Sequence, residues 1–121
     1  MHNFHELEIW KCSRVLVKEI YQASRKFPKE EVFSLCNQIQ RAAVSVPSNI
    51  AEGCGRGPNA NMHYYLGIAI GSSCEVETQL LLAHDLNYID KDLTDRLTQE
   101  LTEVRIMMIK FQNRFTKDRQ E

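Results

Sequence analysis

The sequence has few residues that make turns and no long apolar run. Five glycines and three prolines occur among 121 residues, which is too few for the many turns of an all-β fold. The longest apolar runs have four residues, as in Leu80–Ala83, whereas a membrane-spanning helix needs roughly 20. The first residues lack the basic start and apolar stretch of a secretory signal. We therefore expect a cytoplasmic protein that makes no contact with membranes.

Cysteines are also sparse, and they lie far apart at Cys12, Cys36, Cys54 and Cys74. No pair has the close Cys-x-x-Cys spacing of a zinc or redox site. No glutamate is followed three residues later by histidine, which is the ligand spacing of di-iron helical bundles. We predict that the protein binds no metal and no cofactor, and that its cysteines are small buried apolar groups.

An excess of basic charge is missing as well. Lysine and arginine total 15 against 16 acidic residues, for a net charge of −1. A protein that grips nucleic acid through its phosphates normally has a broad basic surface. Only a local cluster on the first helix could supply such contacts: Lys11, Arg14, Lys18, Arg25 and Lys26. Any nucleic-acid binding should therefore be weak and strongly dependent on salt.

Helical periodicity is what the sequence does contain. Three turn-rich interruptions, around residues 26–29, 53–59 and 87–90, separate four segments with this periodicity. We predict helices over about residues 5–26, 30–52, 59–86 and 91–116. Because short connections favour antiparallel neighbours, we expect a single all-α domain over residues 1–121, folded as an antiparallel up-and-down four-helix bundle.

Each segment carries an apolar seam that should face the core, centred on Ile20, Ile39, Leu80 and Leu101 in chain order. Pro47 lies inside the second seam, where we expect a kink and not a break. The first segment has a further apolar stripe: Leu7, Trp10, Val17 and Tyr21. This stripe is either a subunit interface or part of a wide core face.

A polar stripe runs beside the core seam on the two middle segments. It comprises Gln38, Arg41, Ser45, Ser48, Asn49 and Glu52, followed by Ser72, Glu75 and Gln79. An antiparallel pairing through the glycine-rich turn should place Gln38 and Arg41 level with residues 70–73, within reach of Ser72 and, further along, Glu75. The stripe is then a solvated face, a hydrogen-bonded seam inside the bundle, or a contact between subunits.

No catalytic residues are predicted. Some helical ribonucleases, the HEPN group, pair arginine and histidine at a spacing close to that of Arg56 and His63. Here Gly57-Pro58 puts a turn between the two. Arg56 is more simply a partner of Glu52 four residues before it, or a solvent-exposed residue. A serine or cysteine nucleophile with an oriented histidine and acid is not visible.

A family resemblance is carried by two long stretches and one dipeptide. They are residues 38–53, which include the run Pro47-Ser48-Asn49-Ile50-Ala51-Glu52-Gly53, residues 65–80, and Phe27-Pro28. The chain resembles, over essentially its whole length, the four-helix-bundle proteins of the 23S rRNA-intervening sequence family. The resemblance implies a cytosolic homopentamer with no established enzyme activity. The chain is also similar to the accessory variability determinant proteins of diversity-generating retroelements. Those are basic pentameric barrels that bind nucleic acid and a reverse transcriptase, and this chain departs from them in its near-neutral charge.

The leading hypothesis is a non-enzymatic oligomeric scaffold or adaptor that associates with itself and with an unidentified protein partner. The alternative is an RNA- or DNA-binding assembly factor like the retroelement accessory proteins. A HEPN-like ribonuclease is the third hypothesis.

Overall fold

The computed structural model describes residues 3–57 and 59–115, and within them the chain is helical with no strand. Two short 3-10 turns precede the first two long helices. The elements in chain order are η1 (Phe4–Glu6), α1 (Glu8–Ser24), η2 (Lys29–Glu31), α2 (Leu35–Gly55), α3 (Asn59–Asp85) and α4 (Lys91–Gln112). Within these ranges, no helix has both the length and the apolar character needed to cross a membrane.

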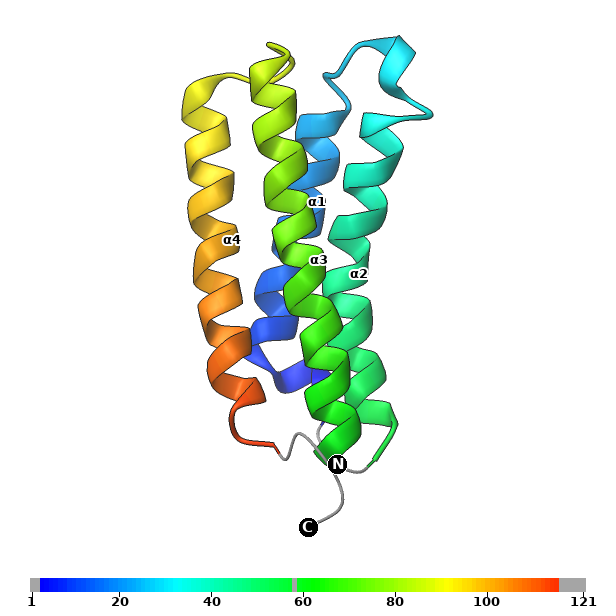
Figure 1. The fold of residues 1–121 in the computed structure, drawn as a ribbon, viewed down its shortest axis with the longest axis vertical. Helices are drawn as coiled ribbons and strands as arrows, with labels where there is room; N and C mark the ends of the chain where they lie inside the picture. Colours follow the sequence, from blue (N-terminus) through cyan, green and yellow to red (C-terminus); the bar gives the residue numbers. More distant parts are fainter. Residues whose placement is uncertain (1–2, 58, 116–121) are drawn as a thin grey trace.

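The four long helices pack around a common core, each against two others. The backbone of α1 lies close to α2 and α4, and that of α3 lies close to the same two helices. The described parts of the diagonal pairs, α1 with α3 and α2 with α4, do not approach each other as closely. In Figure 1 the end of α1 and the start of α2 lie at one end of the molecule, as do the end of α3 and the start of α4. The end of α2 and the start of α3 lie at the opposite end. The helices therefore occupy the four corners of a square in chain order.

The predicted apolar seams form the core. Ile20, Ile39, Leu80 and Leu101 are all buried, and one continuous cluster joins residues of all four helices. α2 runs without interruption through Pro47. Because proline has no amide hydrogen, only one backbone hydrogen bond is lost there while the flanking residues Val46 and Ile50 stay buried. Burial of the apolar seam is thus sufficient to keep this helix continuous.

Two helices begin later than the sequence pattern predicts. α1 starts at Glu8 and not at residue 5, because residues 4–6 form η1. α2 starts at Leu35 and not at residue 30, because η2 follows Pro28 and Ser34 has non-helical backbone angles (φ −128°, ψ −102°). The segment before α2 has no apolar seam to hold it in the core, since Phe33 is 92% exposed. α2 then extends to Gly55, beyond the predicted residue 52, and α4 ends at Gln112; the predicted end at residue 116 lies outside the described residues.

Close approach at Gly53 sets the spacing of α2 and α3. A Cβ atom on Gly53 would lie 3.0 Å from Met62 Sδ and 3.2 Å from Tyr65 Cβ. A side chain at this position would require Met62 and Tyr65 to shift by a few tenths of an ångström. Further along the same pair, Ser45 faces Ser72 with their Oγ atoms 2.8 Å apart. The register expected from the sequence would instead have set Ser45 opposite Leu66, so the true pairing lies almost two helical turns further along α3.

Candidate functional site

The polar residues of α2 and α3 meet at a pair of serine hydroxyls. Ser45 and Ser72 share a hydrogen bond of 2.8 Å, and Ser72 is buried. The Asn49 side-chain amide donates to the Ser45 carbonyl oxygen at 2.8 Å and to Ser45 Oγ at 2.9 Å. Asn49 therefore holds the Ser45 side chain against α3. A hydrogen-bonded seam does exist inside the bundle, but it is short.

An open hollow of about 250 Å³ lies beside this serine pair. Its lining comes from α2 and α3: Gln38, Arg41, Ala42, Ser45, Ser72 and Glu75. Arg41 and Glu75 are both exposed on its rim. Within the described part of the chain, Arg41 has no hydrogen bond or ion pair, and Glu75 accepts only a long 3.4 Å contact from the Gln79 amide. A cation and an anion thus stand near each other with most of their bonding capacity unused.

Gln79 lies next to this hollow and is buried. Its Nε2 points to Glu75, but its Oε1 is buried with no hydrogen-bond partner among the described residues. An unpaired buried carbonyl oxygen of this kind costs free energy. It marks the α2–α3 seam as a place where polar groups are not all satisfied within one chain.

The two remaining members of the predicted polar stripe lie away from the hollow. Ser48 is exposed, and Glu52 is paired with Arg56 at 2.7 Å near the end of α2. That pairing confirms the expected contact between residues four apart. The Arg56 guanidinium also lies 5.6 Å from the centre of the Tyr65 ring, so Arg56 is engaged with Glu52 and Tyr65. In the residues that can be described, no contact joins it to His63.

Metal-binding and nucleophilic groups are dispersed. Across residues 3–57 and 59–115, no group of three or more histidine, cysteine, aspartate and glutamate side chains is placed to hold a metal ion. All four cysteines are free thiols. Cys36 and Cys54 are buried as expected of small apolar groups, whereas Cys12 is half-exposed and Cys74 is exposed. Burial raises the pKa of the Cys54 thiol, and burial together with the Glu8 charge raises the pKa of Cys12. A raised pKa leaves less of the reactive thiolate.

The predicted basic cluster forms one exposed face of α1. Lys11, Arg14 and Lys18 point outward from the helix, with Arg25 and Lys26 directly after its end, and all five are exposed. None of them has an acidic partner in the described residues. The Arg14 guanidinium stacks over the Trp10 ring at 4.8 Å from its centre.

The apolar stripe predicted as a subunit interface is half-buried. Leu7, Trp10, Val17 and Tyr21 all have intermediate exposure, and the first three pack against the chain's own core. The Trp10 ring meets Phe4 edge-on, with ring centres 5.1 Å apart, and His5 at 5.3 Å. The stripe therefore forms the edge of the core beside the basic face of α1.

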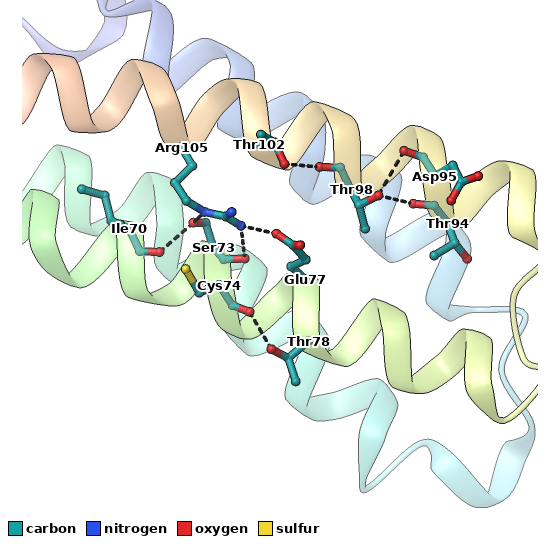
Figure 2. A network of polar contacts seen from close by, with 10 residues as sticks. All are labelled: Ile70, Ser73, Cys74, Glu77, Thr78, Thr94, Asp95, Thr98, Thr102 and Arg105. Carbon is teal, nitrogen blue, oxygen red and sulfur yellow. Dashed lines mark hydrogen bonds and ion pairs between the residues drawn. The ribbon is translucent and has the colours of Figure 1, made fainter.

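A polar contact that the sequence analysis missed joins α3 to α4 (Figure 2). Arg105 Nε donates to Ser73 Oγ at 2.9 Å, and Nη2 donates to the Ser73 carbonyl at 3.3 Å and to Glu77 Oε1 at 2.6 Å. Threonines along the same seam bond their own helix carbonyls, for example Thr102 to the Thr98 oxygen at 2.9 Å. The contact therefore joins the two helices directly. The sequence does show an arginine inside an apolar pattern, which could have indicated a polar contact. Its partners on α3 could not be predicted, because they depend on the register of the two helices.

Comparisons with known proteins agree with this fold. The model of the 23S rRNA-intervening sequence protein family matches residues 5–110, most of the chain. No curated protein matches it. A solved structure from Bacteroides thetaiotaomicron, of a protein with unknown function from the S23 ribosomal protein family, is similar with a TM-score of 0.80. The two are 23% identical, and the match covers 87% of this chain and 95% of that chain. At this identity the likeness shows a shared fold.

Proposed function

Because the chain belongs to the 23S rRNA-intervening sequence protein family, we propose that it is a non-enzymatic scaffold or adaptor of the cytoplasm. It assembles with copies of itself and presents a polar hollow to a partner protein. The number of subunits follows from the family resemblance, which implies a ring of five. Its subunit is an antiparallel up-and-down bundle, a reading supported by contacts such as Gln112 Nε2 to the His63 carbonyl, where a late residue of α4 meets an early residue of α3.

The observation that carries the proposal is the pair of unused charges beside the serine contact. Arg41 and Glu75 line the same hollow, and neither has an ion pair in the part of the chain that can be described. A guanidinium offers five hydrogen-bond donors in a planar fork, which suits a carboxylate of a partner. Glu75 would accept from a cationic or amide group next to it. Such a site suits recognition of a protein surface with both kinds of charge.

Self-assembly is tested by the mass of the purified protein in light scattering at micromolar concentration. The chain has a mass of 14.1 kDa, and a ring of five has about five times that mass. A mass near that of one chain would reject the assembly. A dimer or tetramer would keep self-association and discard the stoichiometry of the family.

The role of the hollow is tested separately by capture from the native cell. Tagged wild-type protein should retain a partner that Arg41→Glu loses. Arg56→Glu changes an exposed arginine outside the hollow in the same way and should retain the partner. If both variants capture the same proteins as wild type, the hollow is not the adaptor site.

A second function, an RNA- or DNA-binding assembly factor like the retroelement accessory proteins, is favoured by the unpaired basic face of α1. Lys11, Arg14 and Lys18 could each contact a phosphate, and every such contact steepens the dependence of affinity on salt. Fluorescence anisotropy with labelled RNA and DNA across a salt series measures this slope. Tight binding that survives physiological salt would place this function ahead of the scaffold.

A further inference from the structure

Two exposed helix faces of this chain carry opposite charge. The outward face of α1 presents Lys11, Arg14 and Lys18, with Arg25 at its end, and no acidic residue is exposed between positions 11 and 25. The outward face of α4 presents a second row of exposed residues: Asp92, Asp95, Gln99 and Glu103. Two cations of α4, Lys91 and Arg96, are exposed as well. Lys91 is paired with Asp95 at 2.6 Å, and Arg96 with Glu19 at 2.8 Å and Glu100 at 3.0 Å. Asp92 and Glu103 have no ion pair among the residues described.

Contacts within the chain show which residues of α1 and α4 lie at the same level along the bundle. Arg96 Nη1 contacts Glu19 Oε2 at 2.8 Å. Cys12 and Leu16 share a groove with Glu100, Glu103 and Val104. Nearer the other end, Glu8 shares a groove with Lys110. By the regular rise of both helices, Arg14 lies level with Glu103 and Arg25 with Asp92.

From this arrangement we propose that the basic face of α1 in one copy binds the acidic face of α4 in the next copy. The inference rests on the proposed self-assembly and names the surfaces that make it. In a ring whose axis runs along the helices, each residue keeps its level from one copy to the next. Arg25 then meets Asp92, and Arg14 meets Glu103, with no shift along the axis.

The sign of the charge changes on both faces at the same level. Below the basic row of α1 comes Glu8, which is exposed. Below the acidic row of α4 comes Lys110, which is also exposed and lies level with Glu8. A second copy therefore matches both parts of both faces. A nucleic acid would match only the basic part of α1 and would leave the acidic row of α4 unexplained.

The positions of the two faces favour a closed assembly. α1 and α4 occupy neighbouring corners of the bundle, so their outward faces point in directions about 90° apart. A head-to-tail contact between such faces turns the assembly at every step and closes a small ring of about four or five copies. Val15 and Ile106, which are exposed on these faces, would lose contact with water. The hollow between α2 and α3 lies on the other side of the bundle and stays open to a partner.

Charge reversal tests the contact. Arg14→Glu and Glu103→Arg each set like charges against each other in the assembly, and like charges at an interface are strongly unfavourable. Each single variant should raise the dissociation constant of the assembly at least about tenfold, measured by sedimentation or light scattering across a dilution series. The double variant Arg14→Glu/Glu103→Arg restores opposite charges and should return the constant to within about threefold of wild type. Arg56→Glu, a reversal near the end of α2 that lies outside both faces and outside the hollow, should leave it unchanged.

The outcomes separate this inference from the proposed function. A wild-type mass near that of one chain overturns both. An assembled wild type whose mass survives both single reversals overturns only the α1–α4 contact. Failure of the double variant to reassemble, after both singles dissociate, overturns the pairing of these two faces. Since Arg14 stacks on Trp10, circular dichroism must show that each variant folds; if Arg14→Glu does not, Arg25→Glu with Asp92→Arg repeats the test at the other end.

Discussion

At the scale of single residues, Arg105 makes a polar contact between α3 and α4 that is partly shielded from water. It donates three hydrogen bonds, two to Ser73 and one to Glu77, and its side chain is half-buried at 19% exposure. Arg105→Ala removes these bonds and leaves the Glu77 carboxylate without its cation. Hydrogen bonds to charged groups contribute about 1.5–3 kcal/mol. We expect the variant to lose about 1–3 kcal/mol of unfolding free energy in urea denaturation.

Lys91→Ala is the matched control for that measurement. Lys91 also forms an ion pair, with Asp95 at 2.6 Å, but both side chains are largely exposed. Exposed pairs of residues four apart contribute only about 0.3–0.5 kcal/mol. Equal losses for Arg105→Ala and Lys91→Ala would contradict a special role for Arg105.

Leu101 provides the corresponding test of the apolar core. Its side chain is 3% exposed in the centre of the α4 seam. Leu101→Ala should leave a cavity and lower the free energy of unfolding by about 2–5 kcal/mol. Leu82→Ala removes the same atoms from a position that is 47% exposed and should cost far less. A small loss at Leu101 would mean that α4 presents a different face to the core.

Residues of the core could be predicted from the sequence, and those of the polar contacts only in part. Apolar spacing identifies Ile39 and Leu101, because the periodicity within a single helix is enough to show which of its faces is apolar and will be buried. Arg105 was missed, since its contact depends on which residue of α3 stands opposite. The Ser45–Ser72 bond shows the same limit: both serines were assigned to the polar stripe, but their partnership requires a register that periodicity does not supply. The acidic row of α4 is visible in the sequence as charge spacing. That it lies level with the basic row of α1 can be known only from the packing of the two helices.

At the scale of the elements, the connection between α1 and α2 shows why helix starts were misplaced. Residues 30–34 were predicted to be helical, but Glu31 instead receives hydrogen bonds from Ser34 Oγ at 2.6 Å and from the Leu35 amide at 3.3 Å. Tyr88 Oη, from the turn between α3 and α4, donates to the same carboxylate at 2.8 Å. A side chain distant in the sequence thus helps to fix where α2 begins, and no local pattern could reveal it.

The Glu31 contacts make a prediction about acid stability. Hydrogen bonds from Ser34, Tyr88 and the Leu35 amide hold the pKa of Glu31 below its ordinary value of 4.5. A carboxyl whose pKa is depressed in the folded protein stabilises the fold at pH values above its pKa in the unfolded chain. This contribution is lost as the pH falls through the pKa of the folded state. Wild type should therefore be more stable than Tyr88→Phe at pH 7. The difference, measured by urea unfolding, should shrink as the pH drops below 4.5.

Glu30→Gln supplies the background for this series, because Glu30 is exposed at the neighbouring position of η2. The difference in unfolding free energy between wild type and Glu30→Gln should not shrink with falling pH in the way expected for Tyr88→Phe. Tyr88→Phe removes only the hydroxyl and keeps the ring that packs against Phe27. A Tyr88→Phe deficit that stays constant from pH 7 to pH 3 would therefore contradict a contribution from the bond to the ionised Glu31 carboxylate.

At the scale of the whole molecule, the two sides of the bundle differ in kind. The α1–α4 side carries complementary rows of charge at matching levels, while the α2–α3 side carries the polar hollow with Arg41 and Glu75. The proposed scaffold would use the first side for contact with its own copies and the second for a partner protein. Net charge near zero is compatible with this division, because the charges of opposite sign are separated onto different faces.

Trp10 lies between the core and the proposed assembly face, and the last prediction concerns this residue. Its ring packs on Phe4 and His5, and Arg14 stacks over it at 4.8 Å. Trp10→Glu would place a carboxylate beside Arg14 and occupy the guanidinium that is proposed to meet the next copy. We expect the mass in light scattering to fall toward that of one chain while circular dichroism retains the helical signal. Trp10→Phe, which keeps an apolar ring under Arg14, should stay assembled. Loss of helical signal in Trp10→Glu would instead make Trp10 part of the bundle core and remove it from the assembly face.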